Sequence, residues 1–411
     1  MAQLNITLNQ EEILLLLSEN RDDAFKKLLQ ESLNSILKAE SKEQLKAEPY
    51  ERSEDRQDVR NGSRERQLTT RIGTFTLVVP RHRNQPFKTM VFDNYRRSEA
   101  ALVATMAEMV VNGVSTRKVA KVMEVLCETT FSKSAVSEVC KDLDRDVKEF
   151  RERPLTEKYP FVMFDATYFK VREDHRILSK AMLIALGTRL DGTREVIGFA
   201  VYDGENNTSW TDFLLSLRQR GLNDLDLFTS DAHESIRYAI GKVFPGCAWQ
   251  RCQTHFSRNI MDAAPKKYAE GIHVALLDMY HSKTVEEARK KRDAIMDEYS
   301  EVAEKAMDIL DEGFEDAMTV MALPESMRRF FRTNNHLERL NRELKRRSKV
   351  IGVFPNRESV LRLMGSALLE LNENLLFVKR ANYHKADVAA LPACREVLRE
   401  IAMEQRKLSV A

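Results

Sequence analysis

Long apolar runs and structure-breaking residues are both scarce in this chain of 411 residues. The longest uninterrupted aliphatic run, Ile13 to Leu17, is far shorter than the ~20 residues that a membrane helix needs. The chain has only 14 Gly and 10 Pro and lacks a low-complexity tract, which excludes a fibrous or mainly disordered protein. At roughly 150 residues per domain, we expect a helix-rich protein of two or three domains.

The chain also has few cysteines, almost no net charge and no glycine-rich nucleotide-binding loop. The five cysteines are scattered and odd in number, which favours a reducing compartment, the cytoplasm, over a disulfide framework; no export signal is expected. The 65 Lys and Arg against 63 Asp and Glu leave a formal charge of +2, so only a local charge distribution can indicate a nucleic-acid partner. Without a glycine-rich phosphate loop, nucleotide hydrolysis has no support.

The N-terminal region combines an amphipathic helix with a basic segment. Residues 9–48 have apolar side chains at helical spacing, and we expect them to pack on their own domain or on a second copy rather than on a membrane. From Tyr50 to Arg97 there are 11 Lys or Arg against 6 Asp or Glu. This segment holds a turn-like stretch at 58–66 and a short strand within 71–83 closed by Pro80. Its cations could follow a phosphate backbone, or the hairpin could simply be solvated.

Two short amphipathic segments follow, at residues 115–126 and 132–143. Each begins with a Ser that could cap a helix and continues with apolar residues at helical spacing, so together they predict a helix-turn-helix. Arg117, Lys118, Lys133 and Ser134 would then face DNA. A plain helical hairpin remains the alternative, because Glu138 and Asp142 would repel phosphate.

The next region changes from helical to strand-like patterns. Residues 161–171, 181–187 and 195–202 predict a meander of three strands. Helix 209–220, strand 225–231, helix 234–243 and strand 247–252 are predicted to follow, and this order matches an α/β ribonuclease H-like domain. From about residue 256 to 331 the pattern is almost entirely helical.

Two aspartates lie where this predicted sheet could bind a ligand. Asp165 interrupts an apolar strand, and burying an unpaired carboxylate costs several kcal/mol unless something such as a cation compensates it. Asp231 stands at a strand-to-helix junction, where ligands gather in open α/β sheets, although it could also cap the helix. Two acids on adjacent strands would suit Mg²⁺.

A third acid is expected from the most basic part of the chain, residues 328–349. This stretch contains nine Lys or Arg against two acids, Glu338 and Glu343. An acid next to a cationic stripe suits a metal and a phosphate backbone, and the alternative is a surface helix with ordinary salt bridges. The 107 residues between Asp231 and Glu338 exceed what a strand and a helix require, so a helical insertion is predicted.

The segment after the last predicted strand contains Cys252 and His255 at metal-like spacing, with Cys247 nearby. A zinc site lacks a convincing fourth ligand, so these residues are expected to order the junction with the helical insertion. Arg251, Arg258 and Asn259 could grip nucleic acid. Trp249 could stack on a base or belong to the core.

Four sequence blocks stand out, at Phe164 to Arg172, Ser230 to His233, Trp249 to Asn259 and Glu338 to Asn356. Together they resemble the bacterial insertion-sequence transposases of the Mutator superfamily, and the resemblance runs from about Tyr50 to about Arg380. The chain departs from the family's usual glycines at Ala166 and Ser235, neither of which would be a ligand.

The resemblance implies a catalytic Asp-Asp-Glu triad of Asp165, Asp231 and Glu338, which selects Glu338 over Glu343. It also implies two Mg²⁺ ions per active site, with Mn²⁺ able to substitute, and phosphoryl transfer by water and then by a DNA 3′-hydroxyl. The partners would be the double-stranded inverted repeats and the target DNA, bound by a homodimer or larger assembly associated with the nucleoid, with no membrane involved.

These inferences give an α/β ribonuclease H-like catalytic domain interrupted by an all-α insertion, after mainly helical DNA-binding regions. The expected segments are 1–48, 49–98, 99–152, 153–257, 258–330 and 331–411. The expected function is a DNA transposase, and the alternative is a transposon-derived DNA-binding regulator without catalysis. The expected DNA contacts are Arg117, Lys118, Lys133, Ser134, Trp249, Arg251, His255, Arg258, Asn259, Arg342, Lys345, Arg346, Arg347 and Lys349.

Overall fold

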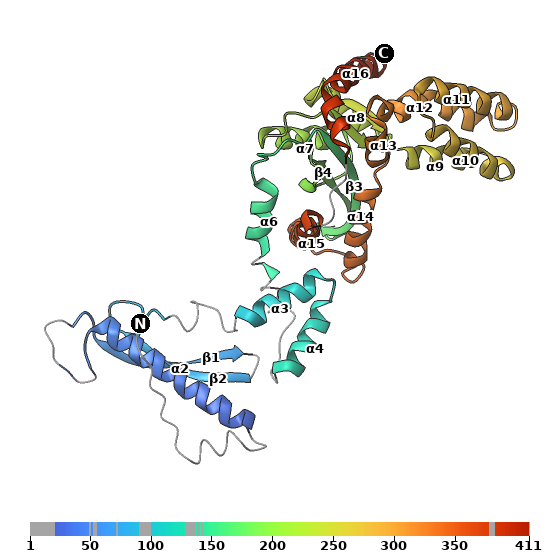
Figure 1. Cartoon of the computed structure of the whole chain (residues 1–411). Coiled ribbons are helices and arrows are strands. Elements are labelled where there is room, and N and C mark those ends of the chain that lie inside the picture. The colour runs from blue at the N-terminus through green and yellow to red at the C-terminus, as the bar shows by residue number, and fades with distance from the viewer. Residues whose placement is uncertain are drawn as a thin grey trace. The chain divides into compact units, whose positions relative to one another are not determined.

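The computed structural model of the chain is shown in Figure 1. It describes residues 21–48, 51, 56–70, 73–89, 100–127, 136–137, 140–141, 143–377 and 383–410. The chain divides into two compact units, residues 1–142 and 143–411, and each is described by itself. No helix in the described ranges combines the length and the apolar character that a membrane span requires. The finer division into six segments stays a prediction.

The first unit contains a long helix packed on a two-stranded hairpin. Its elements are α2 (Arg21–Leu45), β1 (Arg60–Thr70), β2 (Gly73–His82), α3 (Ala100–Val111) and α4 (Thr116–Cys127). Leu37 of α2 is fully buried against Phe75 and Leu77 of β2. The described part of the predicted N-terminal helix therefore packs on its own unit, and the residues before Arg21 lie outside the described ranges.

The hairpin corrects two predictions. The stretch 58–66 was expected to be turn-like, but strand β1 begins at Arg60, because antiparallel pairing with β2 satisfies its backbone while its polar side chains face solvent. Pro80 does not close the second strand, since β2 continues to His82. Pro80 pairs with Ser63 beside a register shift, on a ribbon whose strands are both edges, where a missing N–H is tolerated.

Helix α4 confirms the first half of the predicted helix-turn-helix. The Lys118 N–H donates to Ser115 Oγ at 3.4 Å, and Val119 and Met123 are fully buried. Arg117 and Lys118 are exposed. Lys133 and Ser134 lie outside the described residues, so the second half stays a prediction.

The second unit is built on a five-stranded mixed sheet in the order β5-β4-β3-β6-β7. Strands β3, β4 and β5 form the predicted antiparallel meander, and β6 and β7 run parallel to β3. The predicted helices between the later strands are also present. The elements are α6 (Leu143–Glu152), β3 (Phe161–Glu173), β4 (Arg176–Thr188), β5 (Arg194–Tyr202), α7 (Asn207–Gln219), β6 (Leu227–Ser230), α8 (Glu234–Val243) and β7 (Ala248–Arg251).

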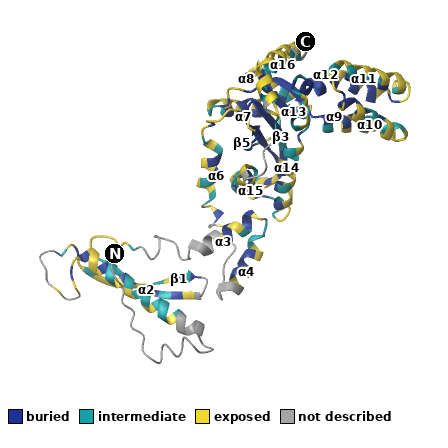
Figure 2. Ribbon diagram, in the orientation of Figure 1, coloured by how far each residue is buried: buried dark blue, intermediate teal, exposed yellow. Residues whose placement is uncertain are grey.

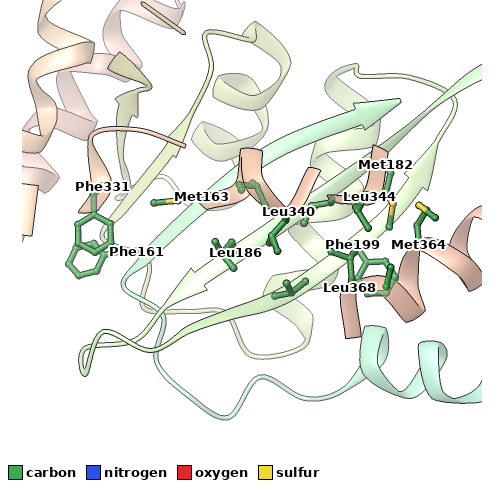
Figure 3. Packing of buried hydrophobic residues seen from close by; sticks show 14 of the residues in the cluster. Phe161, Met163, Met182, Leu186, Phe199, Phe331, Leu340, Leu344, Met364 and Leu368 are labelled. Carbon is green, nitrogen blue, oxygen red and sulfur yellow. The ribbon is translucent and has the colours of Figure 1, made fainter. Parts of the chain in front are cut away.

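Helices cover both faces of this sheet, which makes the strands the most buried part of the unit (Figure 2). Alternate residues of β3 point to opposite faces. Val162 and Phe164 join the hydrophobic cluster formed with α7 and α8. Phe161 and Met163 join the opposite cluster, which Figure 3 shows packed against the C-terminal helices. Asp165 is two residues after Met163 and therefore points to the same face of the sheet, which the C-terminal helices cover.

A helical segment separates β7 from the C-terminal helices. It comprises α9 (Gln253–Ala263), α10 (Lys266–Tyr280), α11 (Val285–Tyr299), α12 (Glu304–Met318), the 3₁₀ turn η1 (Thr319–Ala322) and α13 (Glu325–Phe331). Its first four helices enclose a hydrophobic cluster of their own and lie to one side of the sheet (Figure 1). The Gln253 N–H donates to the Arg332 carbonyl oxygen at 3.0 Å, so the two ends of the segment meet. The chain then forms α14 (Asn335–Ser348), α15 (Arg357–Phe377) and α16 (Lys385–Val410).

Candidate active site

Strand register brings Asp165 and Asp231 to the same place on the sheet. In the parallel pairing of β3 with β6, Phe161 lies opposite Leu227 and Met163 opposite Thr229, an offset of 66 residues. Carried two residues further, past the end of β6 at Ser230, the same offset would bring Asp231 next to Asp165, and the charge of Asp231 does contribute to the raised pKa of Asp165. Neighbouring strands are about 4.8 Å apart, so the two carboxylates lie close together. Their spacing in the sequence is therefore a consequence of the register.

The surroundings of Asp165 make its negative charge costly. Burial, and after it the charge of the nearby Asp231, together raise the pKa of Asp165 to about 7. Hydrogen bonds from the Ala166 N–H, at 2.9 Å, and from Asn341 Nδ2, at 2.7 Å, act in the opposite direction. Two acids that repel each other in a buried setting are stabilised by a cation between them.

Helix α14 lies along β3 and carries Glu338 toward this region. Asn334, just before the helix, donates to the Phe164 carbonyl oxygen at 3.1 Å, and Asn341 donates to Asp165. Glu338 lies four residues after Asn334 and three before Asn341, so the three share one side of the helix. The Oε1 atom of Glu338 lies 3.4 Å from His255 Nε2 on α9. Glu338 thus lies on the side of α14 whose neighbouring asparagines contact β3, beside His255.

The sequence reasoning missed a fourth acid, Glu205, in the turn after β5. Its side chain is only 12% exposed, its Oε2 lies 3.9 Å from His233 Nε2, and its Oε1 accepts a hydrogen bond of 2.8 Å from the Tyr168 hydroxyl. The charge of Glu205 also contributes to the raised pKa of Asp165. The signal that could have revealed it is its place just past a strand parallel to β3, at the same edge of the sheet.

The donor atoms at this edge suit a hard divalent ion. Carboxylate and amide oxygens are the ligands that Mg²⁺ prefers, and the buried Oδ1 atoms of Asn341 and Asn334 have no hydrogen-bond partner. In the described part of the chain, no three His, Cys, Asp or Glu side chains already stand in an arrangement that could hold a metal ion. The fit therefore rests on the paired Asp165 and Asp231 and on the chemistry of their neighbours.

Sequence comparison settles the family. Residues 1–377 match the family described as "Transposase, Mutator family". The chain belongs to the Mutator family of transposases. The resemblance inferred from the four sequence blocks is thereby confirmed.

Individual relatives of this Mutator-family chain include transposases of three insertion sequences. The chain is 42% identical over 384 residues to the transposase for insertion sequence element IS256 in transposon Tn4001 of Staphylococcus aureus, covering 92% of this chain and 98% of that protein. It is 39% identical to the ISRM5 transposase of Rhizobium meliloti, covering 87% and 90%. It is 35% identical to the IS1081 transposase of Mycobacterium tuberculosis, covering 89% and 88%.

The junction around Cys252 is structural in this Mutator-family chain. Cys252 is fully buried and its sulfur accepts a hydrogen bond of 3.4 Å from the Asn334 N–H, which ties the start of α9 to the start of α14. Burial raises the pKa of Cys252 and of Cys247, so neither thiol favours the thiolate form that binds zinc. The expectation that these residues order the junction fits this geometry.

Burial also decides between the alternatives for Trp249. Its side chain is 3% exposed and its Nε1 donates to Ser230 Oγ at 3.0 Å, while the Arg237 guanidinium stacks on its ring at 4.5 Å. The indole is therefore a core residue, as the alternative interpretation proposed, and not a platform for a base. The Arg251 side chain also packs on an aromatic ring, with its guanidinium 4.4 Å from the centre of the Phe256 ring.

The cationic helix α14 is less uniform than its sequence indicates. Arg347 is 4% exposed and forms ion pairs with Glu343 and Glu370, so its predicted role in binding phosphate is corrected to one in packing. Arg346 is exposed and also pairs with Glu343. Lys345 donates to the Tyr168 carbonyl oxygen. Arg342 and Lys349 are exposed, with no acid within 4.0 Å among the described residues.

The raised pKa of Asp165 predicts a pH-dependent cost in the metal-free protein. An acid whose pKa is higher in the folded than in the unfolded state destabilises the fold progressively from about pH 4 to pH 7 and fully above it. Asp165→Asn is therefore expected to raise the free energy of unfolding at pH 8 in EDTA by up to about 4 kcal/mol, at ~1.4 kcal/mol per pKa unit. Denaturant unfolding at pH 4 and pH 8 measures this difference, which should vanish at pH 4. The same gain at both pH values would contradict the explanation.

Proposed function

We propose that this chain is a DNA transposase that binds the terminal inverted repeats of its insertion sequence, cleaves DNA there and transfers the freed strands. The observation that supports the site most directly is the β3–β6 register, whose continuation beyond Ser230 would bring Asp231 next to Asp165, and the charge of Asp231 contributes to the raised pKa of Asp165. Membership of the Mutator family supports the activity.

In this proposal Asp165, Asp231 and Glu338 are the acidic triad. The two aspartates would hold a divalent cation, and α14 would supply Glu338 as the third acid. Asn341 orients Asp165 through its amide, and His255 orients Glu338. Two bound Mg²⁺ or Mn²⁺ ions would activate water or a DNA 3′-hydroxyl and stabilise the leaving oxygen. The protein's own contribution is to position acids and phosphate.

We further propose that the second unit is a ribonuclease H-like domain with an all-α insertion. Three antiparallel strands, followed by two strands parallel to the first, support this fold. The separate hydrophobic cluster of α9–α12 and the hydrogen bond that joins the ends of the helical segment support an insertion. The first unit would then bind the inverted repeats, with Arg117 and Lys118 at the DNA.

A cleavage assay tests the proposal. Purified protein with Mg²⁺ or Mn²⁺ is expected to cut linear DNA that carries the ends of its insertion sequence, and to leave DNA of the same length without those ends intact. Equal cutting of both substrates would identify a general nuclease. Binding without cutting in either metal would identify a DNA-binding regulator.

The exposed cations of α14 predict how salt affects DNA binding. Because Arg342 and Lys349 have no acidic partner in the described residues, each is expected to contact a phosphate and release a counterion. The double variant Arg342→Gln/Lys349→Gln should flatten the slope of log K against log salt by roughly 2. Binding titrations between low and moderate salt measure this slope. Arg346→Gln is the matched control and should change it less, because Glu343 already neutralises Arg346.

A further inference from the structure

A cavity of about 420 Å³ opens beside the candidate active site, and no function described so far uses it. It lies between α9, α10 and the segment that joins α13 to α14. Thr254 and Asn335 line it, one residue before His255 and three before Glu338 respectively.

The charge of this cavity is strongly positive. Three arginines line it, Arg258, Arg329 and Arg332, and none has an acid within 4.0 Å among the described residues. Asp262 is the single acid in the lining. Arginines gathered without acidic partners repel one another unless an anion lies between them. The guanidinium group suits phosphate in particular, because its planar donors can form paired hydrogen bonds.

Another part of the lining is apolar and carries buried hydroxyl groups. Met261 and Leu277 line it, and Leu277 is 43% exposed despite its size. Tyr280 is 8% exposed, and its hydroxyl oxygen accepts a hydrogen bond of 3.1 Å from Ser257. The two hydroxyl groups thus form a polar pair within the lining. Apolar surface, an aromatic ring and hydroxyl groups are suited to the face and edge of a nucleobase.

We propose that this cavity binds a single nucleotide unit, with its phosphate at the arginines and its base against Leu277 and Tyr280. The cavity is near the small end of the roughly 300–1,000 Å³ range of ligand pockets, so a duplex cannot enter it. The nucleotide comes from an unpaired position of the DNA strand or from free nucleotide in solution. The first source rests on the proposed transposase function. If the nucleotide comes from the DNA strand, the cavity holds an unpaired nucleotide next to the scissile phosphate.

Two binding measurements in EDTA test the proposal on the full chain without requiring cleavage. The first compares a blunt duplex carrying the terminal repeat with the same duplex bearing an unpaired nucleotide at its end. The second titrates a deoxynucleoside monophosphate alone by calorimetry. Wild type is expected to bind the tailed duplex about 10-fold more tightly than the blunt one, as stacking of one base can provide.

The arginine pair and the apolar wall are varied separately. Arg329→Gln/Arg332→Gln and Leu277→Asn should each abolish the preference for the tailed duplex, with the thermal unfolding midpoint unchanged as a check of folding. Lys290→Gln, which removes an exposed charge from α11 outside the cavity, should retain the preference. Asp262→Asn should strengthen nucleotide binding, because it removes the acid from the cationic lining.

The outcomes separate the sources and the proposals. Monophosphate binding that depends on the arginines, without a preference for the tailed duplex, assigns the cavity to free nucleotide. The same monophosphate binding, in a protein that does not bind repeat DNA at all, would contradict the transposase function but support the cavity as a nucleotide-binding site. Two results would overturn the nucleotide site. In the first, the folded Arg329→Gln/Arg332→Gln and Leu277→Asn proteins bind the tailed duplex and the monophosphate as tightly as wild type does. In the second, wild type neither prefers the tailed duplex over the blunt one nor binds the monophosphate.

Discussion

Replacing Asp165 by Asn is expected to reduce cleavage at the ends of the insertion sequence by about 10³-fold or more while binding of those ends stays within about twofold. The reason is that Asn keeps the shape of the side chain and can still accept from Asn341, but lacks the charge that holds a divalent ion against Asp231. Nicked product formed with Mg²⁺ and with Mn²⁺ measures the first effect, and gel-shift titration in EDTA measures the second.

Other variants show whether the loss is specific. Asp231→Asn and Glu338→Gln should behave like Asp165→Asn. Asp224→Asn should cut normally, because Asp224 is a half-exposed carboxylate that pairs only at long range, 3.5 Å from Lys158. Wild-type rates in Asp165→Asn would remove this residue from the mechanism. A strong loss in Glu205→Gln, with none in Glu338→Gln, would instead assign the third acid to Glu205.

Arg347→Met is expected to lower the free energy of unfolding by about 3–5 kcal/mol, the usual cost of breaking a buried ion pair by removing one partner. Arg347 is 4% exposed and donates to Glu370 at 2.7 Å and to Glu343 at 2.9 Å, so it fastens the helix that carries Glu338 to α15. Without it, the partly buried Glu370 would lose this partner, and Glu343 would keep the exposed Arg346. Denaturant unfolding measures the loss.

Arg346→Met is the matched control, since Arg346 contacts the same Glu343 from an exposed position and should matter little. The pH dependence gives a second check. Hydrogen bonds from Arg346 and then Arg347 lower the pKa of Glu343 to about 2. An acid with a lowered pKa stabilises the fold above its unfolded value and loses that contribution as pH falls. The gap between wild type and Arg347→Met should therefore narrow from about pH 4.5 to pH 2. Similar stability of the two Met variants at pH 7 would show that burial does not matter here.

Hydrophobic periodicity was enough to predict the sheet of the second unit. Strand-like apolar runs separated by polar turns, notably Asp191-Gly192, marked β3 to β5, and helix α8 occupies the predicted residues 234–243. The offset between Asp165 and Asp231 was visible in the sequence, but its meaning depends on parallel pairing, which a local pattern cannot reveal. Structure supplied the register that makes the two acids neighbours.

The failures share a physical cause, because each depends on contacts between segments far apart in the sequence. Strand β1 is polar along most of its length and becomes a strand only by pairing with β2. In the sequence, Arg347 could not be distinguished from its exposed neighbours, because its partner Glu370 lies 23 residues later. Glu205 belongs to no recognisable motif and gains significance from the folding of β5 beside β4.

The hydrogen bond between Gln253 and Arg332 closes the neck of the helical segment. The side chains of Gln250 and Gln253 also donate to the carbonyl oxygen of Ala317, so the start of the helical segment is bonded both to its end and to α12. A graft that replaces the helices between Gln253 and Arg332 would therefore have to supply an equivalent acceptor for these two side chains.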